Sequence, residues 1–213
     1  MSRSPRHPVR SLFAGSGRRG VLVLLVVAVG VVLAAPATAG ASVSEAHAKA
    51  YKKKLAVYDK WMQNEQAHFN NNSQTANMWV RVIQDALSLG QPDLLAMDEQ
   101  SCLEVRGRML DEVQDRRKDS DKDMDKFAAQ ALTWFPPKTA KADKKSFADA
   151  FKLVRAGLTE LYTAERGLGS ALLALGISAD ISTANDKIFT AGSQAITAQA
   201  EFDRGLTGLR KLQ

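Results

Sequence analysis

The sequence predicts an all-α fold, an antiparallel four-helix bundle with a long, coiled-coil-like first helical hairpin, after an N-terminal signal peptide. Three observations support this prediction. Apolar residues recur at steps of three and four along four segments, which is the repeat of a helix face. Glycine or proline separates consecutive segments. No segment alternates with a period of two residues, as a half-buried strand would.

The N-terminal segment has the composition of an export signal. Residues 1–39 hold five arginines and no acidic residue, residues 21–35 are uninterrupted by any polar side chain, and Pro36 to Ala39 end in small residues. We expect cleavage after Ala39, which leaves residues 40–213 as a single helical-bundle domain. The alternative is an uncleaved membrane anchor, because residues 21–41 are about as long as the roughly 20 residues that span a bilayer.

The first helix is expected over residues 44–89. Its apolar stripe keeps a regular spacing through a polar stretch at 70–74, where we expect a weak point or a bend and not a loop. Gly90-Gln91-Pro92 should end it, because glycine closes a helix and proline cannot continue one. The stripe consists of Tyr51, Leu55, Tyr58, Met62, Glu65, Phe69, Asn72, Ala76, Trp79, Ile83 and Ala86.

The second helix is expected to begin near Pro92. Apolar positions disappear over residues 114–123, so this stretch either extends a helix into solvent or breaks it near Ser120. The stripe returns at Met124 and reaches Phe135, and Pro136-Pro137 should stop the helix, because proline lacks the backbone donor.

The last two helices are expected over residues 143–175 and from Asp180 or Ser182 to the C-terminus, with Gly176 ending the first of them. Both are rich in glycine and alanine, which allows their backbones to approach closely. The first hairpin is longer than the second. The bundle therefore either tapers or lets the first hairpin project, in which case its apolar stripe needs a cover.

Charge and cysteine content exclude several classes of function. Without the five arginines of residues 1–39, 24 basic residues face 23 acidic ones, so the mature chain is nearly neutral. This argues against a nucleic-acid partner and against attraction to anionic membranes; we expect a membrane role only through an uncleaved leader. Cys102 is the single cysteine, so no intramolecular disulfide can form.

The candidate chemical sites are sparse. Glu65-x-x-His68 has the spacing of a di-metal ligand pair, but His47 lies on the same helix and no second copy of the motif exists. Cys102, on an apolar-periodic helix, is interpreted as a core residue. The alternating acids Asp119, Asp121, Asp123 and Asp125 resemble a calcium loop, yet interleaved lysines indicate a salt-bridged surface.

We therefore expect no enzyme, and we assign no catalytic, cofactor-binding or metal-ligating residue. The leading hypothesis is a secreted or extracytoplasmic binding module that contacts a protein, the cell envelope or another copy of itself through the long first hairpin. Trp61, beside the main stripe, is a candidate anchor if it is exposed. The alternative function is a carrier of a small ligand, metal or haem near Glu65 and His68. The alternative location is a single-pass membrane anchor formed by the N-terminal apolar segment.

Overall fold

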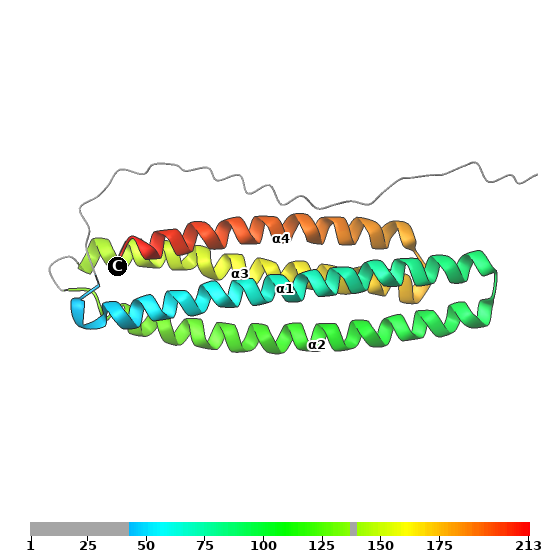
Figure 1. Ribbon diagram of the computed structural model, residues 1–213, viewed down its shortest axis with the longest axis horizontal. Coiled ribbons are helices and arrows are strands. Elements are labelled where there is room, and N and C mark those ends of the chain that lie inside the picture. Colours follow the sequence, from blue (N-terminus) through cyan, green and yellow to red (C-terminus); the bar gives the residue numbers. More distant parts are fainter. Residues whose placement is uncertain (1–42, 137–139) are drawn as a thin grey trace, which may run out of the picture. The chain divides into compact units, whose positions relative to one another are not determined.

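The computed structural model describes residues 43–136 and 140–213. Four helices run side by side with alternating directions (Figure 1), and these residues contain no strand. The predicted all-α four-helix bundle is confirmed. The predicted signal peptide and its cleavage bond lie outside the described residues. The helices are α1 (Glu45–Leu89), α2 (Pro92–Ala131), α3 (Ala140–Ser178) and α4 (Ile181–Arg210).

Helix α1 follows the predicted stripe closely. Nine of the eleven stripe residues are buried, and the other two, Asn72 and Trp79, are half-buried. The helix continues without interruption through residues 70–74. Gly90 ends it in the left-handed conformation, at φ 62°, and its backbone N–H donates to the carbonyl of Leu87.

Helix α2 runs unbroken through the charged stretch at 114–123, so the break near Ser120 does not occur. Ser120 is buried, and therefore this stretch is not a free extension into solvent either. The prediction that Pro136-Pro137 stops the helix is wrong by about one turn. The helix ends at Ala131, and a turn carries Phe135 into the core, where its ring lies 5.7 Å from that of Phe147.

Helix α3 passes through Gly176, which was expected to end it. A Cβ at Gly176 would lie 2.6 Å from the Cγ of Leu103, so this glycine permits close contact with α2 and does not act as a terminator. The actual end is made by Ala179, at φ 50°. Asp180 then caps α4, because its side chain accepts a hydrogen bond from the backbone of Thr183 at 3.0 Å.

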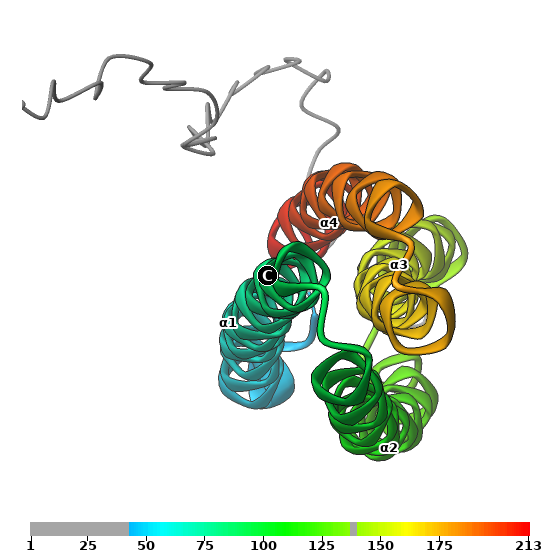
Figure 2. The ribbon, with the colours of Figure 1, turned by 90° about the vertical axis from the view of Figure 1, so that its right-hand side faces the viewer.

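The two helix pairs differ in closeness. Among the helix pairs in contact, α3 and α4 touch most extensively and α1 and α2 least. Glycines explain the tight pair: a Cβ at Gly157 would lie 2.6 Å from the carbonyl oxygen of Ala198, and one at Gly205 would lie 2.6 Å from that of Ala150. Figure 2 shows the four helices around a common core, with α1 and α3 flanking α4.

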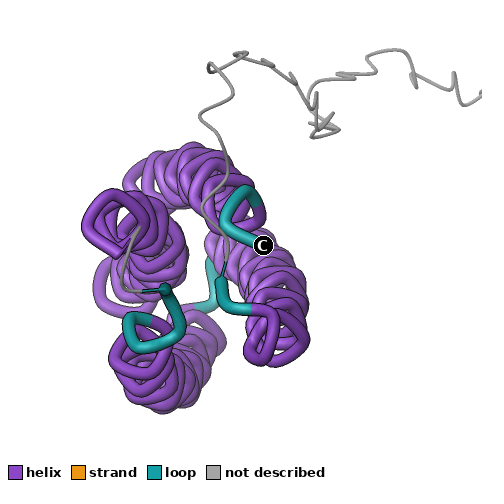
Figure 3. Tube along the Cα trace, turned by 90° about the vertical axis from the view of Figure 1, so that its left-hand side faces the viewer, coloured by secondary structure: helices purple, strands orange, loops and turns teal. Residues whose placement is uncertain are grey.

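Aromatic rings fill one end of the core. The ring of Phe127 lies between 5.4 and 6.0 Å from those of five other aromatic residues, which are Tyr51, Tyr58, Trp134, Phe147 and Phe151. The start of α1 and the end of α4 meet here (Figure 3), where the N–H of Val43 donates to the carbonyl of Leu212 at 3.0 Å. We call this region the aromatic end.

The first hairpin projects at the opposite end (Figure 1). The contacts of Gly176 place the last turn of α3 beside Glu99 and Leu103 of α2. Residues 84–98, which we call the hairpin tip, extend past that level. Of the two arrangements that the sequence allows, projection is therefore the one that occurs. Among the described helices, none combines the length and apolar character that a membrane span requires.

Candidate functional site

The structure separates the two residues of the Glu65-x-x-His68 motif. Glu65 is buried and faces the core, whereas His68 is exposed. The carboxylate of Glu65 accepts a hydrogen bond from Nε of Arg116 at 2.9 Å. This carboxylate is therefore occupied by a guanidinium on α2 and not by an interaction with His68.

Arg116 joins three helices in a buried charged layer near the middle of the bundle. Its Nε contacts Glu65 on α1, and its Nη2 donates to Oε2 of Glu165 on α3 at 2.5 Å. Glu165 is fully buried, and its second oxygen, Oε1, has no hydrogen-bond partner. One guanidinium thus serves two carboxylates in a region of low dielectric.

Because the single guanidinium of Arg116 faces the two carboxylates of Glu65 and Glu165, this layer has one positive charge fewer than it has carboxylates. Burial raises the pKa of Glu165 to about 7, and the stabilising field of Arg116 offsets this effect only in part, while the charge of Glu65 adds to it. Burial also raises the pKa of Tyr162, whose hydroxyl contacts Oγ of Ser120 at 3.2 Å. The charged layer therefore contains one group, Glu165, whose pKa lies near neutral pH, and the side chain of this group is closed to solvent.

Three of the four alternating acids of α2, Asp121, Asp123 and Asp125, belong to a network of ion pairs. Asp121 and Asp125 both bind Arg155 of α3, at 3.4 and 2.6 Å. Asp123 binds Lys54 of α1 at 2.6 Å. The interpretation as a salt-bridged surface agrees with these contacts, which in addition link α2 to its neighbours.

The remaining candidates are far apart or packed in the core. Cys102 is buried, its thiol contacts the carbonyl of Leu172 at 3.4 Å, and burial raises its pKa to about 11. His47 stacks on Trp134 at the aromatic end, 5.4 Å between ring centroids. Trp61 is half-buried and packs against Tyr58, so it is not the free anchor that the sequence suggested as a possibility.

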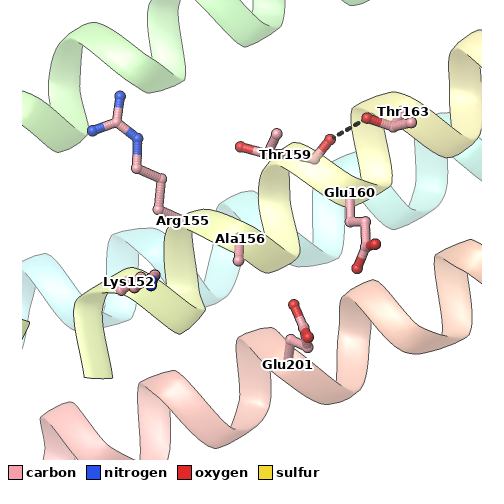
Figure 4. Close-up of a pocket in the computed structure, with 7 residues that line it drawn as sticks. All are labelled: Lys152, Arg155, Ala156, Thr159, Glu160, Thr163 and Glu201. Carbon is pink, nitrogen blue, oxygen red and sulfur yellow. Dashed lines mark hydrogen bonds between the residues drawn. The ribbon is translucent and has the colours of Figure 1, made fainter. Parts of the chain in front are cut away.

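A shallow groove runs between α3 and α4 (Figure 4). The carboxylates of Glu160 and Glu201 point toward one another across it, while Arg155 reaches out toward α2. The other lining residues are Lys152, Ala156, Thr159 and Thr163. No nucleophile is paired with a base in this groove. Within the residues that the structure describes, no three His, Cys, Asp or Glu side chains gather in a way that would hold a metal ion.

The hairpin tip is the region with the clearest features of a contact surface. Leu87, Leu89 and Met97 are 45%, 60% and 68% exposed, although all three belong to helices with a buried stripe on the opposite side. Because these side chains project into solvent at the end of the longer hairpin, they are accessible to a partner.

The tip and its surroundings are also acidic. The tip contains Asp85, Asp93 and Asp98, Glu99 and Glu104 follow it, and residues 82–105 include no lysine, arginine or histidine. None of these five acids forms an ion pair with another residue of the described chain. Our sequence interpretation missed this surface, and the signal that reveals it is the run of 24 residues without a basic side chain.

Comparisons with known proteins give no assignment, since no family model, no curated protein and no solved structure matches this chain.

Proposed function

We propose that this protein is an exported, non-enzymatic binding module that acts at the cell envelope or outside the cell and docks on a protein partner through the hairpin tip. The observation that carries the proposal is the exposure of Leu87, Leu89 and Met97 on the part of the first hairpin that extends past α3. These side chains lie outside the buried stripes of α1 and α2. A partner that docked on the tip would remove them from water.

The absence of a constructed reaction site within the described residues supports a binding role over catalysis. Cys102 is buried against α3, whereas His47 stacks on Trp134 at the aromatic end and His68 is exposed on α1. The groove in Figure 4 contains two half-buried carboxylates without a buried polar group to orient a substrate. Export rests on the composition of residues 1–39 alone.

Site-specific photo-crosslinking in the natural host tests the docking proposal. A crosslinking amino acid is placed at Leu89 or Met97, and in a matched control at Phe189, which is 72% exposed on the outer face of α4. We expect adducts with one extracytoplasmic protein from the tip positions only. Equal adducts from Phe189, or none from the tip, would contradict the proposal. The mass of the exported chain tests cleavage after Ala39 in the same samples.

The alternative proposal, a carrier with its site near Glu65 and His68, requires Glu65 to exchange Arg116 for a ligand. Elemental analysis and an absorbance spectrum of the purified protein test it. A bound metal or a coloured sample that is lost in His68→Ala would support the carrier. A colourless, metal-free sample would oppose it.

A further inference from the structure

We propose that the outer face of α4 is a self-association surface, on which a second copy of this chain packs antiparallel about a two-fold axis at the level of Ala195. What we call the α4 face consists of Phe189, Gly192, Ser193, Ile196, Thr197 and Ala200. The inference goes beyond the docking function of the hairpin tip and does not depend on it. Three properties carry it: exposed apolar side chains on one side of the helix, the absence of charge between them, and opposite charges at the two ends.

Two large apolar side chains of the α4 face are exposed on the same side of the helix. Phe189 and Ile196 are 72% and 60% exposed, and they lie seven residues apart, which is about two turns. Buried residues of α4, such as Ala191 and Ala198, lie on the other side, against α3. In Figure 2 one side of α4 is turned away from the other three helices. The two large side chains therefore share one surface, and no part of the described chain covers it.

The polar groups of the α4 face are compatible with burial against a partner. Residues 188–200 contain no charged side chain. The hydroxyl of Ser193 donates to the carbonyl of Phe189, and the hydroxyl of Thr197 donates to the carbonyl of Ser193, both at 3.2 Å. A partner on this face thus leaves neither hydroxyl donor without an acceptor. A Cβ added at Gly192 would meet no atom within 4 Å, so the middle of the face also leaves room for close approach.

The charges at the two ends of the α4 face fit a second copy in antiparallel orientation. Asp186 and Arg204 are exposed and lie 18 residues apart, which is five full turns, so they project from the same side of α4. Within the described chain Asp186 has no ion pair, and Arg204 has only a long one, 3.8 Å from Glu201. A two-fold axis at the level of Ala195, halfway between them, places Asp186 of each copy beside Arg204 of the other. Parallel pairing would instead bring like charges together.

The same axis brings large side chains against small ones. With Ala195 at the centre, Phe189 of one copy falls beside Ala200 of the other, and the two copies of Ile196 meet next to Ser193. The contact strip is about 27 Å long and about 10 Å wide, the diameter of a helix, which is less than the about 800 Å² per partner of a standard interface. We therefore expect a reversible dimer with a Kd in the micromolar range.

Two other occupants fit less well. Helices that lie on a membrane surface carry lysine and arginine around their apolar side. The α4 face is instead bordered by one acid and one base at each end, Asp186 with Lys187 and Asp203 with Arg204. A different protein would need opposite charges of its own at the spacing of Asp186 and Arg204, whereas a second copy of the chain has them already.

Sedimentation equilibrium of the protein purified from its exported pool tests the inference. We expect a monomer–dimer equilibrium with a Kd below about 100 µM. Asp186→Arg and Arg204→Asp each bring like charges together and should raise the Kd about ten-fold, and the two changes combined should restore it. Asp111→Arg, at an exposed position of α2, makes the same charge change away from the α4 face and should leave the Kd unchanged. Circular dichroism checks that all variants remain helical.

Cysteine crosslinking tests the antiparallel arrangement. Ile196→Cys places one thiol of each copy next to the axis, so mild oxidation should join the two copies by a disulfide. Ala200→Cys is the matched control on the same face, because its two copies would lie about 15 Å apart along the helices and out of reach of each other. The natural Cys102 is buried and supplies no competing thiol.

Four results would overturn the inference. The first is a monomer at about 500 µM, well above the expected Kd. The second is a loss of association in both charge variants that their combination does not restore. The third is sedimentation with phosphatidylcholine and phosphatidylglycerol vesicles that Ile196→Ser abolishes, since the face would then meet lipid. The fourth comes from the photo-crosslinker at Phe189, which should join this chain only to itself; an adduct with another protein contradicts the dimer. Crosslinks from Leu89 and Met97 test the docking function separately, so either proposal can fail while the other stands.

Discussion

The aromatic end and the hairpin tip both contain large apolar and acidic side chains, but these side chains have opposite environments at the two ends. At the aromatic end, Tyr51, Phe127 and Trp134 are packed together, and acids such as Asp123 have basic partners. At the tip, Leu89 and Met97 are exposed and the acids are unpaired. Burial and ion pairing stabilise the folded state, so the aromatic end stabilises the fold. The exposed and unpaired side chains of the tip are free to contact a partner.

This division indicates which parts of a helical bundle are available for contact with a partner. A residue that helps to hold the fold has its contacts satisfied within the chain. A residue whose contacts are incomplete, on an element that packing elsewhere holds rigid, is available to a partner. The following predictions test whether the two ends differ as described.

The largest effect is expected at the aromatic hub. Phe127→Ala removes a ring that five others contact, so the free energy of unfolding should fall by about 3–5 kcal/mol. Leu89→Ala at the tip should change it by less than about 0.5 kcal/mol, because that side chain is already in water. Urea denaturation measures both. Similar losses in the two variants would remove the distinction between the ends.

A comparable loss is expected in the charged layer between the two ends. Arg116→Met leaves Glu65 and Glu165 buried without a counter-charge, which should lower the free energy of unfolding by about 3–5 kcal/mol. Replacing both glutamates by glutamine in the same chain should recover much of this loss. If the double replacement gives no recovery, the cost of Arg116→Met comes from packing and not from charge.

The same layer should make stability depend on pH. The pKa of Glu165 is raised from 4.5 to about 7 in the folded protein, so the unfolded chain loses this proton first as pH rises. The contribution of Glu165 is therefore fully present below pH 4.5 and declines, by a few kcal/mol at most, as pH approaches 7. Thermal melts across this range should show the decline in the wild-type protein and a smaller one in Glu165→Gln. Identical pH profiles would contradict the assignment.

A smaller effect on the free energy of unfolding is expected from the close packing of α3 against α4. Gly205→Ala places a Cβ 2.6 Å from the carbonyl oxygen of Ala150 and should lower the free energy of unfolding by about 1–3 kcal/mol. Gly192→Ala on the same helix meets no atom within 4 Å, so it should raise stability by about 0.5–1 kcal/mol. Chemical denaturation of the two variants compares them directly. We expect the two substitutions to change the free energy of unfolding in opposite directions. Changes in the same direction would mean that the space around each glycine does not decide the effect of the added Cβ.

The smallest effect concerns the α3–α4 turn near the tip. Ala179 adopts a φ of 50°, a conformation that costs an L-residue about 1–2 kcal/mol and glycine almost nothing. Ala179→Gly should therefore raise the melting temperature slightly. Ala174→Gly, inside α3, serves as the control and should lower it. A lower melting temperature for Ala179→Gly would show that the turn is not strained.

Much of the fold was predictable because helix periodicity is a local property of the sequence. The stripe from Tyr51 to Ala86 is enough to place α1, and Asp180 marks the start of α4. Errors occurred where the contacts of a residue decide its role. Gly176 has the appearance of a helix stop, but contact with Leu103 requires a glycine there, and the left-handed stop is taken by Ala179, which no local rule would choose.

The candidate site was harder to predict because it depends on which contacts each side chain makes, or lacks, in the folded chain. Glu65 was recognised as a stripe residue, but its partner Arg116 lies in a charged stretch that shows no apolar pattern, so the pairing is visible only in three dimensions. The acidic character of the tip was readable from the sequence alone.

Hydrogen–deuterium exchange in the free protein tests the division between the two ends most directly. We expect the slowest exchange around Tyr58 and Phe127 and the fastest helical exchange at residues 84–98. Uniform exchange along α1, or slower exchange at residues 84–98 than around Tyr58, would contradict this account.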